Sequence, residues 1–196
     1  MKKIVALFAL VAAAGSASAI NVTAAPLTEL PGYADRGVPI FSAMPGPYAG
    51  FPAATGSLGF DDYDSILPGG YDVLTDLKFV GGVTTVGGTL TFNFFHPDGT
   101  AISNFSVNLP SAGNFIWTID TINIVIPTDG IMQIVAGENT TGRWFLSTTA
   151  PTIGTQSADF GGAGGGNSHR FELQVPAPGA AALLGLAGLV AGRRRR

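Results

Sequence analysis

Residues 60–65, with the sequence FDDYDS, hold the densest group of acidic side chains in the chain. Asp61, Asp62 and Asp64 could supply carboxylate oxygens to Ca²⁺, which takes about six to eight oxygen ligands. No EF-hand loop is present, so distant loops would have to contribute the other ligands. The alternative is a solvated turn in which these aspartates accept hydrogen bonds from nearby backbone N–H groups.

Other residue types could also do chemistry. His96 and His169 are the only histidines, and we expect both in surface turns because no further ligand stands at a usual metal-site spacing. Two carboxylates about 5 to 9.5 Å apart could act as a glycosidase pair, but no nucleophile-and-base motif is visible, so we expect no enzyme. Trp117 and Trp144 could form a platform for sugar rings, with core packing as the alternative.

The elements that must position these residues are predicted to be strands. From Phe60 onward the apolar residues recur with a period of two, as in half-buried strands. The groups Leu90/Phe92/Phe94, Phe105/Val107/Leu109, Phe115/Trp117/Ile119, Ile122/Ile124/Ile126 and Phe171/Leu173/Val175 show this pattern, as does VLTDLKF with Val73, Leu77 and Phe79 on one face. The change of parity between residues 119 and 122 predicts a bulge or turn near Asp120 and Thr121.

Turn sequences separate these runs. HPDGT (residues 96–100) predicts a connection between two strands, and GGAGGG (residues 161–166) predicts a flexible loop or linker. Short strands between such turns favour an antiparallel β-sandwich. Residues 20–59 are rich in proline and glycine, which predicts an extended lead-in with one edge strand, held to the body by Tyr33, Phe41, Tyr48 and Phe51.

Composition limits the function classes. The chain has 196 residues and no cysteine, which excludes disulfides and thiol chemistry. All 13 acidic residues lie between the two ends, where Arg36, Lys78, Arg143 and Arg170 are the only basic ones. An acidic body repels phosphate backbones, so we expect no nucleic-acid binding.

The N-terminus predicts export. Lys2 and Lys3 precede an apolar run over residues 4–14, and Ala17 and Ala19 form a small-residue cleavage motif. This is the pattern of a secretory signal peptide. Cleavage after Ala19 would make Ile20 the first residue of the mature protein.

The C-terminus, VPAPGAAALLGLAGLVAGRRRR, combines a proline motif, an apolar stretch and a basic cluster. The 14 residues from Gly179 to Gly192 would form a helix of about 21 Å, which is short against a bilayer core of about 30 Å. On physical grounds the tail predicts a weak anchor whose arginines stay on the cytoplasmic side. The basic cluster is Arg193, Arg194, Arg195 and Arg196.

In this order the three parts resemble the sorting signal of the PEP-CTERM family of bacterial surface proteins. Ala177 stands where the family name places a glutamate. The resemblance implies recognition by a membrane-embedded exosortase, removal of the helix, and release or attachment at the outer surface of a cell that makes extracellular polysaccharide. The implied cleavage motif is Val175, Pro176, Ala177, Pro178 and Gly179.

The body is also similar to those of some planctomycete PEP-CTERM proteins. The shared landmarks are Asp61-Asp62, Gly81-Gly82, Asp98-Gly99, residues 109–117 and residues 142–145. This resemblance covers roughly residues 60–175 and implies a β-sandwich body.

The sequence therefore predicts an all-β protein, an antiparallel and jelly-roll-like β-sandwich over residues 60–174. It is flanked by a signal peptide (residues 1–19), a lead-in (20–59) and a sorting signal with a short hydrophobic helix (175–196). We expect a non-enzymatic protein of the cell surface or extracellular matrix. Its expected partners are the inner membrane and an exosortase, both transiently, and afterwards exopolysaccharide. The alternatives are a lectin-like carbohydrate-binding module, with calcium as its candidate cofactor, and a secreted glycan hydrolase.

Overall fold

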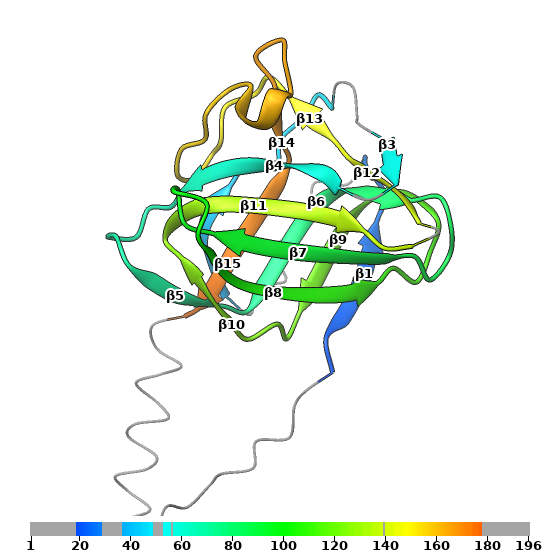
Figure 1. Ribbon diagram of the computed structural model, residues 1–196, viewed down its shortest axis with the longest axis horizontal. Coiled ribbons are helices and arrows are strands. Elements are labelled where there is room, and N and C mark those ends of the chain that lie inside the picture. Colours follow the sequence, from blue (N-terminus) through cyan, green and yellow to red (C-terminus); the bar gives the residue numbers. More distant parts are fainter. Residues whose placement is uncertain (1–18, 29–36, 49–52, 56, 139, 178–196) are drawn as a thin grey trace, which may run out of the picture.

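The computed structural model describes residues 19–28, 37–48, 53–55, 57–138 and 140–177, and it is built of strands (Figure 1). Within this part of the chain the one helical element is the short 3-10 turn η1 (Phe160–Gly162). All the strand pairings are antiparallel. The predicted all-β, antiparallel fold is confirmed.

The larger of two main sheets has seven strands in the order β1-β9-β6, with β6 paired along its other edge first with β15 and then with β12. Strand β2 pairs with β15, and β3 pairs with β12. The strands of this sheet are β1 (Asn21–Ala25), β2 (Gly37–Ser42), β3 (Ala53–Thr55), β6 (Asp76–Val83), β9 (Gly113–Asp120), β12 (Thr141–Trp144) and β15 (Phe171–Pro176).

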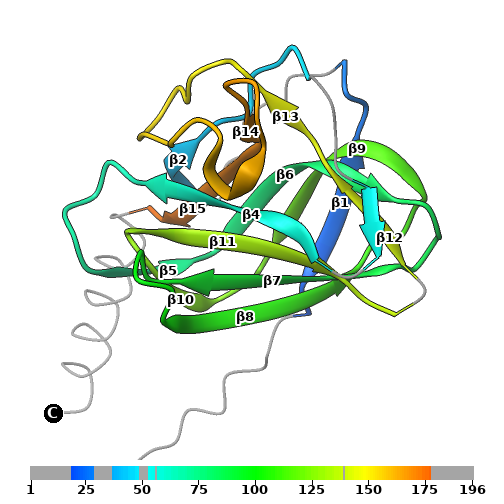
Figure 2. The same ribbon diagram turned by 45° about the horizontal axis from the view of Figure 1, so that its top comes forward.

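The smaller main sheet has the order β4-β11-β7-β8 and lies in front of the larger one in Figure 1. Its four strands are seen side by side in Figure 2. Two ribbons complete the fold: β5 pairs with β10, and β13 pairs with β14. These strands are β4 (Ser57–Asp64), β5 (Tyr71–Leu74), β7 (Thr89–Phe95), β8 (Ala101–Asn108), β10 (Ile124–Pro127), β11 (Asp129–Ala136), β13 (Leu146–Ser147) and β14 (Ser168–His169).

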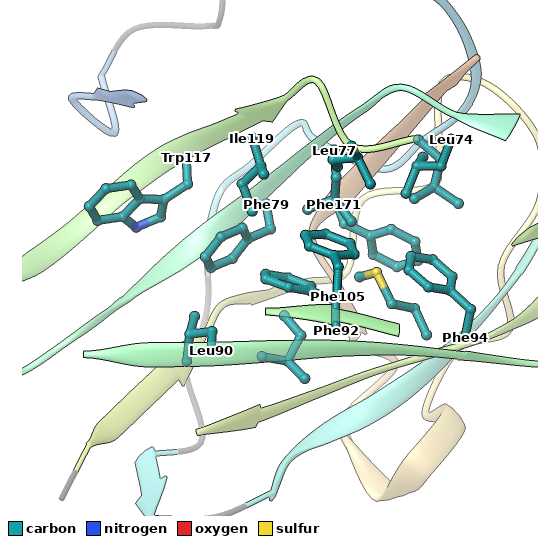
Figure 3. Close-up of a cluster of buried hydrophobic side chains, with 14 of the residues drawn as sticks. Leu74, Leu77, Phe79, Leu90, Phe92, Phe94, Phe105, Trp117, Ile119 and Phe171 are labelled. Atoms are coloured by element: carbon teal, nitrogen blue, oxygen red, sulfur yellow. The ribbon is translucent and has the colours of Figure 1, made fainter. Parts of the chain in front are cut away.

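The main core fills the space between the two sheets (Figure 3). Leu90, Phe92 and Phe94 point inward from β7 and are fully buried, as the alternating pattern predicts. They meet side chains from the larger sheet, such as Phe79, whose ring lies 5.3 Å from that of Phe92. The connection after His96 joins β7 to β8, which is also as predicted.

One inward residue is predicted wrongly. Val73 is only half-buried, whereas Leu74 is fully buried. The reason is a break at Thr75, which separates β5 from β6 and shifts the alternation by one residue. The turn expected near Asp120 is present, because β9 ends there and Thr121 takes a positive φ of 61°.

Residues 20–59 contribute more than the one edge strand expected of them. They supply β1, β2, β3 and the first residues of β4, and Phe41 is fully buried. A second apolar cluster joins Met44 and Tyr48 to Val80 and Ile116 of the larger sheet. The outer face of this sheet is therefore also covered. Tyr33 and Phe51 lie outside the described residues.

Candidate functional site

The three aspartates predicted to bind calcium do not lie together. They sit on β4, where successive side chains point to opposite faces. Asp61 is fully buried on the inner face, whereas Asp62 is half-buried and Asp64 exposed on the outer face. The predicted three-aspartate cluster is therefore wrong.

Asp61 belongs to a buried hydrogen-bond network. Its Oδ2 accepts hydrogen bonds from the backbone N–H of His169 and lies 3.0 Å from Nδ1 of the same residue. Its Oδ1 accepts a bond of 3.0 Å from the backbone N–H of Asp62. Burial raises the pKa of Asp61, and the hydrogen bonds from His169 oppose that rise. These oxygens already have protein donors, so Asp61 connects β4 to β14.

His169 is 4% exposed, so its expected place in a surface turn is wrong. Its ring lies 4.0 Å from that of Trp144. Among the described residues its Nε2 has no hydrogen-bond partner, and a side chain at Gly59 would begin 3.5 Å from that nitrogen. The arrangement of Asp61 and His169 is that of a base and its orienting carboxylate, but a buried Nε2 cannot reach a substrate.

Arg170 is fully buried beside this pair and was not predicted as a site residue. Its Nε and Nη1 donate to the carbonyls of Ser168 and Thr149, at 3.0 and 2.8 Å. Its Nη2 donates to the carbonyl of Ser147 and to the hydroxyl of Ser168. Burial lowers the pKa of Arg170 from 12.5 to about 10, with Asp61 opposing the change. The guanidinium therefore remains charged at neutral pH and ties β14 to the segment after β13.

Trp117 and Trp144 are both fully buried. Their Nε1 atoms donate to the carbonyls of Gly81 and Arg170, at 3.0 and 3.2 Å. A sugar platform needs an exposed ring face, so the platform prediction is wrong and both rings are core residues.

A shallow surface pocket of about 200 Å³ opens where β4 ends and β11 begins. Asp129 lies directly opposite Asp64 across these strands, and Ile131 lies opposite Asp62. Two like charges in directly opposed positions repel each other, so this pairing costs stability. The pocket is lined by Asp62, Tyr63, Asp64, Pro97, Asp129, Gly130, Ile131 and Phe160.

The wall of the pocket that carries Phe160 is held in place by a docked loop. Ser157 donates to both carboxylate oxygens of Asp62, through its backbone N–H at 3.0 Å and its hydroxyl at 2.6 Å. Oδ1 of Asp159 accepts the N–H groups of Gly166 and Asn167, which closes the loop. The glycine-rich segment predicted as a flexible loop or linker is thus a closed loop tied to β4.

The side chains that could bind a metal ion are scattered. The described ranges contain no group of three or more His, Asp or Glu side chains placed to hold one. His96 lies near the surface, where its Nε2 is 2.6 Å from the hydroxyl of Tyr71. The two histidines therefore sit in separate environments.

The predicted processing motifs lie at the margins of the described chain. Val175 and Pro176 form the end of β15, and Val175 is buried. Ala19 is exposed and its carbonyl accepts a bond of 2.8 Å from Thr121. Ala17, Pro178, Gly179 and the cluster of Arg193, Arg194, Arg195 and Arg196 lie outside the described residues. Across the described ranges, no helix has the length and apolar character needed to cross a membrane.

Comparison of the chain with protein-family models, curated proteins and solved structures finds no match.

Proposed function

We propose that this chain is an exported, non-enzymatic protein of the cell surface or extracellular matrix. Its body is a β-sandwich of the jelly-roll-like kind, sorted through a PEP-CTERM-like tail and associated afterwards with exopolysaccharide. The observation that carries the proposal is the order of parts in the sequence: the pattern of a signal peptide at one end, and a proline motif, an apolar stretch and four arginines at the other.

The limits of the folded body support this proposal. Strand β1 begins at Asn21, two residues after the expected signal-peptidase cut at Ala19. Strand β15 ends at Pro176, inside the proline motif. A second cut between Pro176 and Gly179 would leave every strand intact, whereas a cut before Val175 would remove a buried core residue. Both proposed cuts thus fall just outside the body.

Retention on polysaccharide tests the proposal. Residues 20–177 are passed over exopolysaccharide from the cells that make the protein, and a heat-unfolded sample of the same fragment serves as the control. The proposal predicts that the folded fragment is retained and the unfolded one is not. Passage of the folded fragment without delay would contradict the association with polysaccharide.

The surface pocket favours a second candidate, a lectin-like carbohydrate-binding module. The half-buried Phe160 lines the pocket together with the exposed Asp64 and Asp129. An aromatic ring and carboxylates are the two kinds of group that sugars or a sugar-bound Ca²⁺ would contact. This candidate predicts a rise in Tm on adding calcium and oligosaccharide. Asp129→Ala and Phe160→Ala should abolish that rise, whereas Val86→Ala, at an exposed position away from the pocket, should retain it.

The same pocket gives less support to a glycan hydrolase. Directly opposed positions on antiparallel strands have Cβ atoms about 4.5–5.5 Å apart, so Asp64 and Asp129 are close enough to act as a pair. A general acid, however, needs an environment that keeps it protonated, usually burial. Both of these carboxylates are exposed.

A further inference from the structure

The two ends of the described chain leave the larger sheet at the same end of its strands. Strands β1, β9, β6 and β15 are neighbours and alternate in direction. One row of directly opposed residues crosses these four strands, through Val22, Ile119, Leu77 and Leu173. The start of β1 and the end of β15 therefore lie on the same side of this row, and both are at the lower side of the body in Figure 1.

This edge also exposes apolar side chains. Ile20 precedes β1 and is 37% exposed, and Val38 near the start of β2 is 38% exposed. The β5–β10 ribbon extends the same edge, because Asn123 donates to the carbonyl of Leu74, two residues before the first residue of β6. Val125 of this ribbon is 48% exposed. We call this end of the strands, with the exposed residues Ile20, Val38 and Val125, the exit edge.

The sequence beyond each end is apolar. The run over residues 4–14 is connected to Ala19 by a few small residues, and the stretch over residues 179–192 begins two residues after Ala177. If both apolar segments enter one bilayer, these short connections hold the exit edge at that bilayer. Two attachment points at one edge also restrict the rotation that a single tether would allow.

We propose that the exit edge faces the lipid surface while the apolar segments are in the membrane, so that the larger sheet stands with its strands pointing toward the bilayer. This inference rests on the proposed function, since it needs the apolar ends to enter a membrane. It adds an orientation for the body and names the surface that contacts lipid in the unprocessed chain, before the signal peptide and the tail are removed.

Charge does not account for this orientation. Asp72 and Asp120 lie near the exit edge, and an anionic lipid surface would repel them. Of the three described basic residues, Lys78 and Arg170 are buried. The third, Arg143, is half-buried and is paired with Gly82 near the far end of β6. The tethers and the small apolar contact therefore determine the orientation, and it should persist at high salt.

Single-cysteine labelling can test the orientation, because the natural chain contains no cysteine. Val38→Cys and Val125→Cys report on the exit edge. Val86→Cys is the matched control, because Val86 is 67% exposed in the turn after the far end of β6. The seven residue steps along β6 separate its two ends by about 23 Å.

Each full-length variant carries a fluorophore and is reconstituted in phosphatidylethanolamine–phosphatidylglycerol vesicles containing a headgroup-attached nitroxide quencher. Flotation of the vesicles first separates bound from unbound protein. Emission from Trp117 and Trp144 verifies that each variant is folded, since both rings are buried. We expect floated protein to be quenched several-fold more strongly at positions 38 and 125 than at position 86.

The outcomes separate the two proposals. Protein that floats but is quenched equally at all three positions, or most at position 86, would overturn the orientation and leave the sorting proposal standing. Protein that fails to float would overturn membrane insertion of the ends, and the orientation with it.

Discussion

Replacing Asp61 by alanine separates a structural role from a calcium-binding one. The side chain is fully buried and accepts hydrogen bonds from the backbone and ring of His169 and from the backbone of Asp62. Asp61→Ala leaves the two buried donors of His169 without an acceptor. Each buried unsatisfied donor costs about 1–3 kcal/mol.

Removing a buried carboxylate also recovers part of the cost of burying it, so we expect a net loss of about 2–4 kcal/mol in the free energy of unfolding. For a domain of this size the loss corresponds to a fall of about 5–15 °C in Tm. Urea unfolding followed by Trp117 and Trp144 fluorescence measures it. The control is Asp64→Ala, which removes an exposed carboxylate opposite Asp129 and should not lower the stability. An unchanged urea midpoint for Asp61→Ala, or a loss that appears only when calcium is present, would refute the reasoning.

The pKa of Asp61 adds a pH dependence. Its pKa in the folded protein is raised above the ordinary value of 3.8, so the folded state holds this proton more tightly than the unfolded state does. The stabilisation is complete below 3.8 and is lost as the pH rises through the folded pKa. The free energy of unfolding of the natural protein, measured against that of Asp61→Asn, should therefore be most favourable in acid. This difference should shrink as the pH rises. An advantage that grows with pH would show that the sign is wrong.

The remaining predictions concern the buried polar groups and the tryptophans. Arg170→Lys should lower the free energy of unfolding by about 2–4 kcal/mol, because an ammonium cannot reproduce the fork of donors that serves three carbonyls and a hydroxyl. Denaturant unfolding measures this loss. A loss below experimental error would contradict the prediction. The buried ion pair between Lys78 and Glu172, at 3.0 Å, predicts a loss of about 3–5 kcal/mol for Lys78→Met or Glu172→Gln alone. The double variant should lose less than the sum of the single losses, and strict additivity in the double-mutant cycle would refute the coupling. Added polysaccharide should leave the emission maximum of Trp117 and Trp144 unchanged, whereas a shift would place one of these rings at a binding surface.

The strand-rich body could be predicted from the sequence because its pattern is local. Leu90, Phe92 and Phe94 alternate with polar residues, and this alternation marks the buried face of β7 directly. The proline content of residues 20–59 predicted an extended segment with one edge strand. This part of the chain instead supplies three strands and the start of a fourth, and Pro39 lies within one of them, β2. Among the described strands β2 pairs with β15, and its other side carries an isolated bridge from Ser42 to Ile153, at the end of the strand away from Pro39. A proline without an N–H is tolerated where a strand has no neighbour on one side.

The site could not be predicted because its members meet through long-range pairing. Asp64 and Asp129 are opposed only by the register of β4 and β11, and Phe160 reaches them through a loop closed by Asp159. His169 looks like a turn residue because it follows a glycine-rich segment, although its ring packs in the interior. A buried polar residue next to a turn carries no periodic pattern that would reveal it.

The outward-facing residues of β15 show a further limit of periodicity. Glu172 and Gln174 alternate with the core residues and should face solvent, yet they are 2% and 1% exposed. They lie on the outer face of the larger sheet, together with Lys78 and Ser42, where Glu172 accepts a hydrogen bond of 2.7 Å from the Ser42 hydroxyl. Alternation along one strand does not reveal that this second face is also buried.

The intact mass of the protein recovered from the cells that make it tests the central proposal most directly. Processing at both ends predicts a chain that begins at Ile20 and ends between Pro176 and Gly179, apart from any group attached at the new C-terminus. A chain that still carries Arg193, Arg194, Arg195 and Arg196 would contradict sorting by tail removal. The tail would then be a permanent anchor, and the function would have to be sought at the inner membrane.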